Sequence, residues 1–324
     1  MKIRKKLIFL TLFLAVLASS LVLIKESGKK SFDVYDISVI IRGTNSEEWN
    51  IMKAGMEQAS SEMNVNLKFI SLLEENNIKE QEEYLQKSID SETDAIVISP
   101  ADYTELSSTI EDINKKIPIV LFESKIETKQ NIPYISSDNY ELGKKLAEEV
   151  IRNGNTRKKI IIVKSDFKFS SLVDRYNGFI DEISTSKNTY DSIELPKEDF
   201  KLYSEIRDIM EMDKGAVLVA FEPNSLEAIG KAKKYIINNT HSEYNTEVYG
   251  IGRTSSIISL IEEKLINATV IQNEFNIGYL SINTAVNKIK SKKIDDKINI
   301  ESTLINSENM YSKENQKILF PIVR

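Results

Sequence analysis

The sequence predicts an α/β fold built from two parallel sheets, and three observations lead to that prediction. Short runs rich in Val and Ile, such as AIVIS and KIIIV, alternate with longer amphipathic runs. Several of the short runs are apolar throughout, which is typical of parallel strands covered on both faces. About ten strand–helix steps follow one another, too many for one comfortable doubly wound sheet, so two sheets of about five or six strands are expected.

The individual elements follow from the spacing of apolar residues. The expected strands are the short apolar runs, at residues 37–41, 67–71, 95–99, 117–122, 133–136, 159–163, 191–195, 216–221, 247–251, 268–272 and 298–305. The expected helices have an apolar stripe at helical spacing, and they include residues 47–63, 78–89, 103–116, 225–239 and 276–290. The loops are short, and no low-complexity linker follows residue 36.

Composition excludes several classes of function. The 324 residues suffice for two domains with a sizeable core, and the net charge of -6 with no basic stripe argues against nucleic-acid binding. The chain has no cysteine, which excludes disulfides, thiolate nucleophiles and Cys–zinc sites. Its single histidine, His241, lies in the polar run NNTHSEYNTE and is expected to be an exposed loop residue. No catalytic residue, metal site or cofactor is predicted.

The N-terminus predicts a membrane segment. A basic MKIRKK precedes an uncharged run from Leu7 to Ile24, which as a helix would be about 27 Å long, close to the roughly 30 Å hydrocarbon core of a bilayer. We expect an uncleaved single-pass anchor in the cell membrane, with the basic tip in the cytoplasm and the rest extracytoplasmic. A cleaved signal peptide ending near Ala18–Ser20 is the alternative.

The stretch IPYISSDNYELGKKLAEE lies where the first set of strands ends. A short strand runs into Ser-Ser-Asp-Asn and then directly into a helix. Asp138 and Asn139 are both suited to cap that helix by accepting a backbone N–H. We interpret residues 136–139 as a crossing of the chain from one domain to the other, and Gly143 as a position of close helix packing.

Several motifs, in order, resemble the periplasmic sugar-binding protein family of the ribose-binding type, whose fold also serves as the effector domain of lactose-repressor-like regulators. The resemblance covers about residues 36 to 310, and its motifs are ISVIIRGTNSEEWNIMKAGMEQAS, DAIVISPAD, IPIVLFES, YISSDNYELGKKLAE, DRYNGF, VYGIGRT and ATVIQNEFNIG. It implies two Rossmann-like lobes of periplasmic binding protein type I joined by a three-strand hinge. The implied divisions are 1–35 for the cytoplasmic tip, anchor and tether, 36–137 plus 273–300 for the N-terminal lobe, and 138–272 plus 301–324 for the C-terminal lobe.

The same resemblance implies a ligand site in the cleft between the lobes. A sugar is held by aromatic faces against its C–H surfaces and by planar charged groups on its hydroxyls. The positions that match are Asn45, Trp49, Glu123, Arg175, Phe200, Glu222, Arg253 and Gln272. Arg42, at the end of the first strand, is expected to form an ion pair at the surface or between the lobes rather than to contact ligand.

The sequence departs from the family pattern at two places that concern the ligand. Ser124 stands where the family often has arginine, and Gly252 stands where it commonly has an aspartate, with Arg253 next to it. Three arginines, Arg42, Arg175 and Arg253, would suit a sugar acid. The alternative is that Arg253 faces solvent and that the ligand is a small neutral sugar.

The predicted function is an extracytoplasmic sugar-binding protein that closes around its ligand and signals to a membrane sensor histidine kinase, as in xylose-sensing binding proteins. Delivery of the sugar to an ABC permease is the alternative. A glycoside-cleaving enzyme with Glu123 and Glu222 as opposed carboxylates is a third class, which we disfavour because in this fold such a pair holds hydroxyls. A DNA-binding repressor would need a helix-turn-helix before residue 60, where the membrane segment lies instead.

Overall fold

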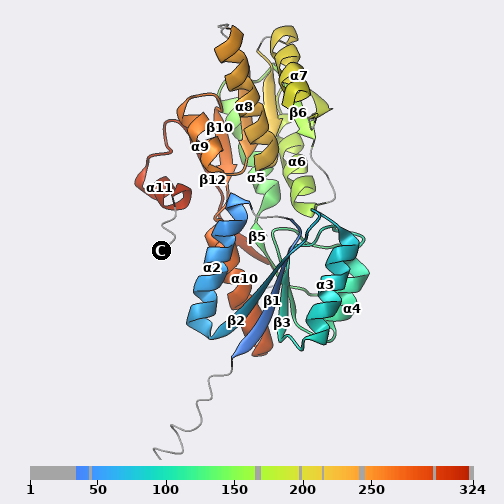
Figure 1. The fold of residues 1–324 in the computed structure, drawn as a ribbon. Helices are drawn as coiled ribbons and strands as arrows, with labels where there is room; N and C mark the ends of the chain where they lie inside the picture. The colour runs from blue at the N-terminus through green and yellow to red at the C-terminus, as the bar shows by residue number, and fades with distance from the viewer. Residues whose placement is uncertain are drawn as a thin grey trace, which may run out of the picture. The chain divides into compact units, whose positions relative to one another are not determined.

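The computed structural model describes residues 34–43, 46–164, 169–196, 199–213, 215–240, 245–294 and 297–320. Two six-stranded sheets organise these residues, with strand orders β11-β5-β4-β3-β1-β2 and β12-β10-β9-β8-β6-β7. We call the first sheet and the helices on it the first lobe, and the other sheet with its helices the second lobe (Figure 1). The prediction of an α/β fold with two sheets is confirmed.

The first lobe contains β1 (Tyr35–Ile41), α2 (Glu47–Met63), β2 (Val65–Ser71), α3 (Ile78–Asp90), β3 (Ala95–Ile98), α4 (Ser107–Asn114), β4 (Ile119–Phe122), β5 (Tyr134–Ser137), α10 (Glu274–Ile289) and β11 (Lys297–Ile300). The second lobe contains α5 (Asn139–Arg152), β6 (Lys159–Lys164), α6 (Ser170–Ile183), β7 (Thr189–Glu194), α7 (Asp199–Met212), β8 (Val217–Ala220), α8 (Pro223–Thr240), β9 (Glu247–Ile251), α9 (Ser255–Glu262), β10 (Ala268–Ile271), β12 (Thr303–Asn306) and α11 (Lys313–Leu319).

The central strands of the second sheet are covered on both faces, which explains their continuous apolar sequences. Ile160 and Ile162 of β6 belong to a core cluster with residues of α5 and α6. Ile161 and Val163 belong to a different cluster with residues of α7, α8 and α9. Because successive side chains of a strand point to opposite faces, a strand between two helical layers must be apolar at every position.

The chain passes between the two sheets at three points. It leaves the first sheet after Ser137 of β5, returns after Ile271 of β10, and leaves again between β11 and β12. The expected single strand over 298–305 is therefore wrong: β11 pairs with β5 in one sheet, whereas β12 pairs antiparallel with β10 in the other. Both halves of the run are suited to a strand, so its pattern alone does not show the break at Glu301 and Ser302.

Glycines let one pair of helices approach closely in each lobe. A Cβ on Gly143 of α5 would lie 1.8 Å from the backbone oxygen of Arg175 in α6, and one on Gly178 would lie 2.0 Å from that of Tyr140. Gly55 and Gly278 have the same role between α2 and α10. The expectation that Gly143 serves close helix packing is confirmed, and the contact it permits fixes the backbone that carries Arg175.

The predicted localisation in the cell membrane through a single-pass anchor is corrected. Within the residues that the structure describes, no helix is both long enough and apolar enough to cross a bilayer. The run Leu7–Ile24, on which the prediction was based, lies outside those residues, as does His241.

Candidate ligand-binding site

A cavity of about 130 Å³ lies where the two lobes face each other. The first lobe contributes residues that follow β1, β3 and β4, together with the start of α2, and the second lobe contributes the start of α6 and of α8. The lining residues are Ile41, Arg42, Gly43, Ser46, Glu48, Trp49, Met52, Glu75, Ser99, Phe122, Glu123, Ser171, Leu172, Arg175, Glu222, Pro223 and Asn224. Carboxyl ends of parallel strands are where open α/β sheets bind their ligands.

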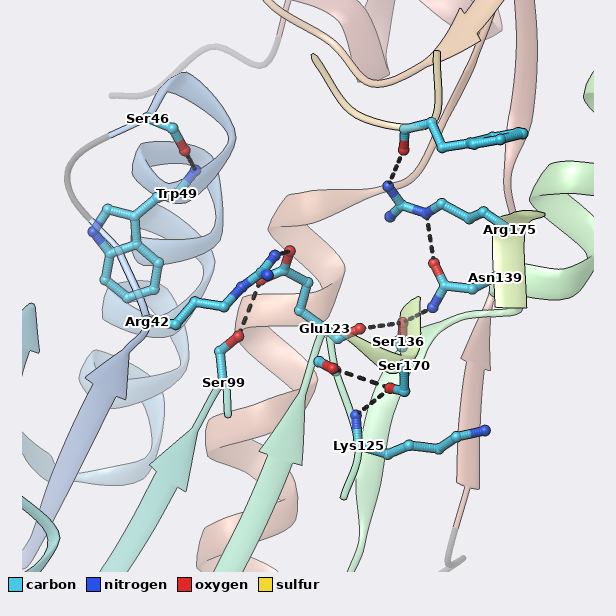
Figure 2. Close-up of polar contacts among 12 residues, drawn as sticks. Arg42, Ser46, Trp49, Ser99, Glu123, Lys125, Ser136, Asn139, Ser170 and Arg175 are labelled. Carbon is cyan, nitrogen blue, oxygen red and sulfur yellow. Dashed lines mark hydrogen bonds and ion pairs between the residues drawn. The ribbon is translucent and has the colours of Figure 1, made fainter. Parts of the chain in front are cut away.

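An ion pair forms the first-lobe wall of the cavity. Arg42 Nη2 lies 2.6 Å from Glu123 Oε1, and Ser99 Oγ donates to Glu123 Oε2 at 3.1 Å (Figure 2). Burial would raise the pKa of Glu123, but the charge and hydrogen bond of Arg42 hold it below its ordinary value. Arg42 thus forms an ion pair, but within the first lobe at the cavity wall and not at the surface or between the lobes as expected. Its partner is a residue that the sequence suggested for ligand contact.

Glu123 also has an unusual backbone conformation. Its φ of 63° is in the left-handed region, which non-glycine residues rarely adopt. Such a conformation costs roughly 1–3 kcal/mol and persists only where the surroundings hold it. Here the Tyr134 hydroxyl donates to the Glu123 carbonyl at 2.9 Å, and the side chain is held by Arg42 and Ser99. Strain of this kind clusters at binding sites.

Arg175 occupies the second-lobe wall and is only 5% exposed. Its Nε donates to Asn139 Oδ1 at 2.9 Å, and its Nη1 donates to the Phe221 carbonyl at 2.9 Å (Figure 2). Burial lowers the pKa of this guanidinium, while the nearby carboxylates of Glu48 and Glu123 act in the opposite direction. A guanidinium with an ordered fork at a cavity wall is suited to adjacent hydroxyls.

Asn139 connects this arginine to the first lobe. Its Nδ2 donates to Ser136 Oγ at 3.0 Å and to the Tyr134 hydroxyl at 3.3 Å, and Tyr134 in turn reaches the Glu123 carbonyl. The cap of α5 is Asp138, which accepts from the Glu141 N–H, so the adjacent Asn139 is available for this network. The polar segment that begins α5 thus connects the two walls of the cavity.

Trp49 is anchored within the first lobe. It is 7% exposed, and its ring packs edge-on to Phe69 at 5.9 Å and tilted against Phe122 at 6.3 Å between centroids. The Ser46 hydroxyl accepts from its backbone N–H and caps α2. Trp49 therefore both lines the cavity and packs in the core of the first lobe.

Three further carboxylates line the cavity, those of Glu48, Glu75 and Glu222. Glu48, in the first turn of α2, accepts from the Arg253 backbone N–H at 3.2 Å, and Glu222 accepts from Ser225 Oγ at 2.9 Å. Burial raises the pKa of Glu48 to about 7, despite the opposing charge of Arg175 and the hydrogen bond from Arg253. Glu222 is one of the positions that the resemblance suggested. Glu48 was missed, because a glutamate in a first helical turn is expected on dipole grounds alone.

The structure does not bring all the suggested residues to this cavity. Arg253 and Gln272 are 7% and 4% exposed but do not line it. Arg253 therefore does not face solvent, and its Nη2 donates to the Leu319 carbonyl. Phe200 is 84% exposed on α7 and also lies elsewhere, because that helix buries Leu202 and Ile206 instead. Asn45 lies outside the described residues.

The lobes touch around the cavity. Ser255 of the second lobe donates its N–H and its hydroxyl to Glu47, at 2.8 and 2.7 Å. Ser170 lies 3.0 Å from Ser124 between hydroxyl oxygens, and the Lys125 N–H donates to Ser170 at 2.9 Å. The Arg42 guanidinium carbon lies 3.8 Å from the centroid of the Phe169 ring. These contacts join the two lobes next to residues that line the cavity.

Two facing α/β lobes with a polar, partly aromatic cavity between them define a class of hinged binding proteins for small solutes. The comparisons identify the family within that class. Residues 37–293 match the model of the periplasmic binding protein domain, which is most of the chain, so the chain belongs to that family. Family membership confirms the prediction of a binding protein and not an enzyme.

Solved structures show the same fold at low sequence identity. A carbohydrate transporter solute-binding protein of Agrobacterium radiobacter, in complex with D-arabinose, has a TM-score of 0.80 at 20% identity, covering 89% of this chain and 100% of that one. GanP, a glucose–galactose binding protein of Geobacillus stearothermophilus, has a TM-score of 0.74 at 19% identity, covering 86% of this chain and 99% of that one. A chain of the XylFII–LytSN complex has a TM-score of 0.73 at 18% identity, covering 85% of this chain and 99% of that one. A search of curated proteins found no match.

Proposed function

We propose that this protein is an extracytoplasmic sugar-binding protein whose lobes close around the ligand in the described cavity. The observation that carries the proposal is the meeting of Arg175 from the second lobe with Glu123 and Trp49 from the first in one buried cavity. A pyranose presents hydroxyls at its edge and C–H surfaces on its faces, and this lining offers a guanidinium, carboxylates and an indole. The solved structures bound to D-arabinose and described as glucose–galactose binding support the same ligand class.

Closure follows from where the ligand contacts lie. We propose that residues 36–137 with 273–300 move as one lobe and residues 138–272 with 301–324 as the other, about the three chain crossings. A ligand that contacts Arg175 and Glu123 together favours the closed state, so binding and closure become one equilibrium. Asn45, Arg253, Gln272 and Glu222 remain proposed ligand contacts, and contact of Arg253 and Gln272 would require a deeper ligand position than the present cavity.

Thermal-shift screening of the full-length chain tests the ligand class. The panel comprises pentoses, hexoses, amino sugars, sugar acids and sugar phosphates. A ligand at 100 times its dissociation constant stabilises the fold by about 2.7 kcal/mol, which is a readable shift in melting temperature. The expected outcome is stabilisation by at least one sugar and loss of that shift in Arg175→Ala. A panel with no stabilising member would contradict the proposal.

For the partner, we propose delivery to an ABC permease first and signalling to a membrane sensor kinase second. The names of the solved carbohydrate transporter proteins support the former, and the solved XylFII–LytSN complex, in which a similar fold has a protein partner, supports considering the latter. Deleting the gene separates them once the sugar is known. Lost uptake of labelled sugar supports delivery, whereas normal uptake with lost sugar-induced transcription supports signalling.

A further inference from the structure

The lining of the cavity carries more carboxylates than cations. Among the described residues, the acidic side chains at its wall are those of Glu48, Glu75, Glu123 and Glu222, and the basic ones are those of Arg42 and Arg175. Glu75 is exposed, so water screens its charge. The balance within the enclosed part therefore depends on Glu48, Glu123 and Glu222.

Both guanidinium groups already have partners within the protein. Arg42 is paired with Glu123 at 2.6 Å, so these two charges largely cancel. Arg175 gives its Nε to Asn139 and its Nη1 to the Phe221 carbonyl, and its single positive charge faces two remaining carboxylates. Among the residues that line the enclosed part, carboxylates thus outnumber guanidinium groups by one. The charge of Arg253 also acts on Glu48, but Arg253 lies outside the lining.

The surroundings of Glu48 compensate the charge of its carboxylate only in part. Its described hydrogen bond is a single backbone N–H, from Arg253. Glu222 instead lies beside the hydroxyl of Ser225 at the start of α8. Burying a carboxylate is unfavourable, and Arg175 and Arg253 offset only part of that penalty, so the pKa of Glu48 stays raised. An incoming positive charge would remove the remaining penalty.

We infer that the ligand is a polyhydroxylated amine, such as an amino sugar, whose ammonium group lies against the Glu48 carboxylate while its hydroxyls contact Arg175. This inference rests on the proposed function and names the ligand class for the same cavity. It replaces the sugar acid suggested by the three arginines. Arg42 is paired with Glu123, two nitrogens of Arg175 already donate to protein acceptors, and Arg253 does not line the cavity.

Matched sugars provide the test. Calorimetry of the full-length protein at pH 7 compares D-glucosamine with D-glucose and D-glucuronate, and D-galactosamine with D-galactose and D-galacturonate. An ammonium–carboxylate hydrogen bond in an enclosed site predicts that the amine of at least one series binds about 10-fold or more tightly than its neutral counterpart. If, in the series that binds more tightly, the neutral sugar or the acid binds as tightly as the amine, the inference is overturned and the proposed function stays intact. If no sugar of any charge binds, both are overturned.

A variant and its matched control locate the effect. Glu48→Gln keeps the shape and removes the charge, so the amine should lose about 10-fold or more in affinity while the neutral sugar changes little. Glu57→Gln removes the same charge from the same helix, but Glu57 is exposed beside Lys53 and outside the cavity. It should leave both affinities within about twofold. Equal losses of amine affinity in both variants would indicate a long-range charge effect and overturn the assignment to Glu48.

The pH dependence distinguishes an ammonium ligand from a neutral sugar that accepts a hydrogen bond from protonated Glu48. The charged groups that face Glu48 are Arg175 on α6, Arg253 before α9, Glu123 after β4 and Glu274 on α10. An ammonium favours the ionised carboxylate, so affinity for the amine should rise from about pH 5.5 to 7 with proton release, and Glu48→Gln should abolish that rise. An affinity that falls over this range overturns the inference.

Discussion

Arg175 combines a binding role with a structural one. Its Nε donates to Asn139 at the first chain crossing, and its Nη1 donates to the carbonyl of Phe221, just after β8. Only part of its guanidinium group is therefore free for a ligand. A residue that faced the cleft without such contacts would be removable at little cost to the fold. The buried position predicts instead that its truncation leaves the Asn139 and Phe221 acceptors unpaired, which costs roughly 1–3 kcal/mol for each such group.

Arg175→Ala should therefore weaken both ligand binding and the fold. We expect a loss of about 2–5 kcal/mol in binding, tens- to thousands-fold in affinity, because a charged donor is removed from an enclosed site. The free energy of unfolding should also fall by about 1–3 kcal/mol. Calorimetry and urea unfolding measure the two effects.

Arg207→Ala is the matched control for that prediction. Arg207 is half-exposed on α7, and its partners are exposed carboxylates, so both quantities should change little. A folded Arg175→Ala protein that binds the identified ligand within threefold of wild type would show that the site is placed wrongly.

The α5–α6 pair is the element that positions Arg175. Gly143 of α5 lies against the backbone oxygen of Arg175 itself, and Gly178 of α6 lies against Tyr140. Because the contacts are between backbones, neither helix can yield to an added side chain by changing a rotamer. The close approach of these helices therefore depends on the absence of a Cβ at Gly143 and Gly178.

Gly143→Ala should destabilise the protein although alanine favours helices. The added Cβ would lie 1.8 Å from the Arg175 oxygen, and overpacking of this kind costs about 1–3 kcal/mol or more, which exceeds the gain of about 1 kcal/mol in helix propensity. Displacement of α6 should also weaken ligand binding. A Cβ at Gly230 of α8 would meet the side chains of Leu260 and Ile266 at 2.8 to 3.2 Å and no backbone atom, so urea unfolding should show a smaller loss for Gly230→Ala. Equal stabilities of wild type and Gly143→Ala would refute the packing argument.

At the scale of the whole molecule, the free energy of unfolding should depend on pH, because the fold contains acids with raised pKa values. Glu274 is 1% exposed at the start of α10, directly after the second chain crossing. Burial, and then the nearby Glu48, raise the pKa of Glu274 to about 8. Its ordinary value of 4.5 applies to the unfolded chain, so between these values the native state holds a proton that the unfolded state releases.

The free energy of unfolding should therefore fall as the pH rises from about 4.5 to 8, by on the order of a few kcal/mol. Glu48 contributes in the same direction. Glu274→Gln, which cannot ionise, should flatten part of this fall, and Glu83→Gln on the exposed face of α3 should not. Urea unfolding at pH 5, 6, 7 and 8 measures the slopes. Parallel slopes for wild type and Glu274→Gln would count against the proton on Glu274.

The sequence by itself determined the fold class and the local structure. Continuous Val- and Ile-rich runs predicted strands covered on both faces, and the alternation of Ile160 and Ile161 between two core clusters is the reason. Helix starts were readable from caps such as Asp138, and a glycine inside the α5 pattern indicated close packing. These features depend on neighbours within a few residues, or on burial of a whole face, and both leave a periodic trace in the sequence.

Only the tertiary structure decided which polar side chains meet. Arg42 and Glu123 are 81 residues apart in the chain, and Arg175 and Asn139 are 36 apart, so no periodicity relates them. Glu48 has the sequence context of an ordinary first-turn glutamate, yet it lines the cavity. Phe200 was suggested as an aromatic ligand contact, yet its side chain is exposed on α7. A pattern reports whether a residue is buried, whereas its partner is set by how sheets and helices from distant parts of the chain are brought together.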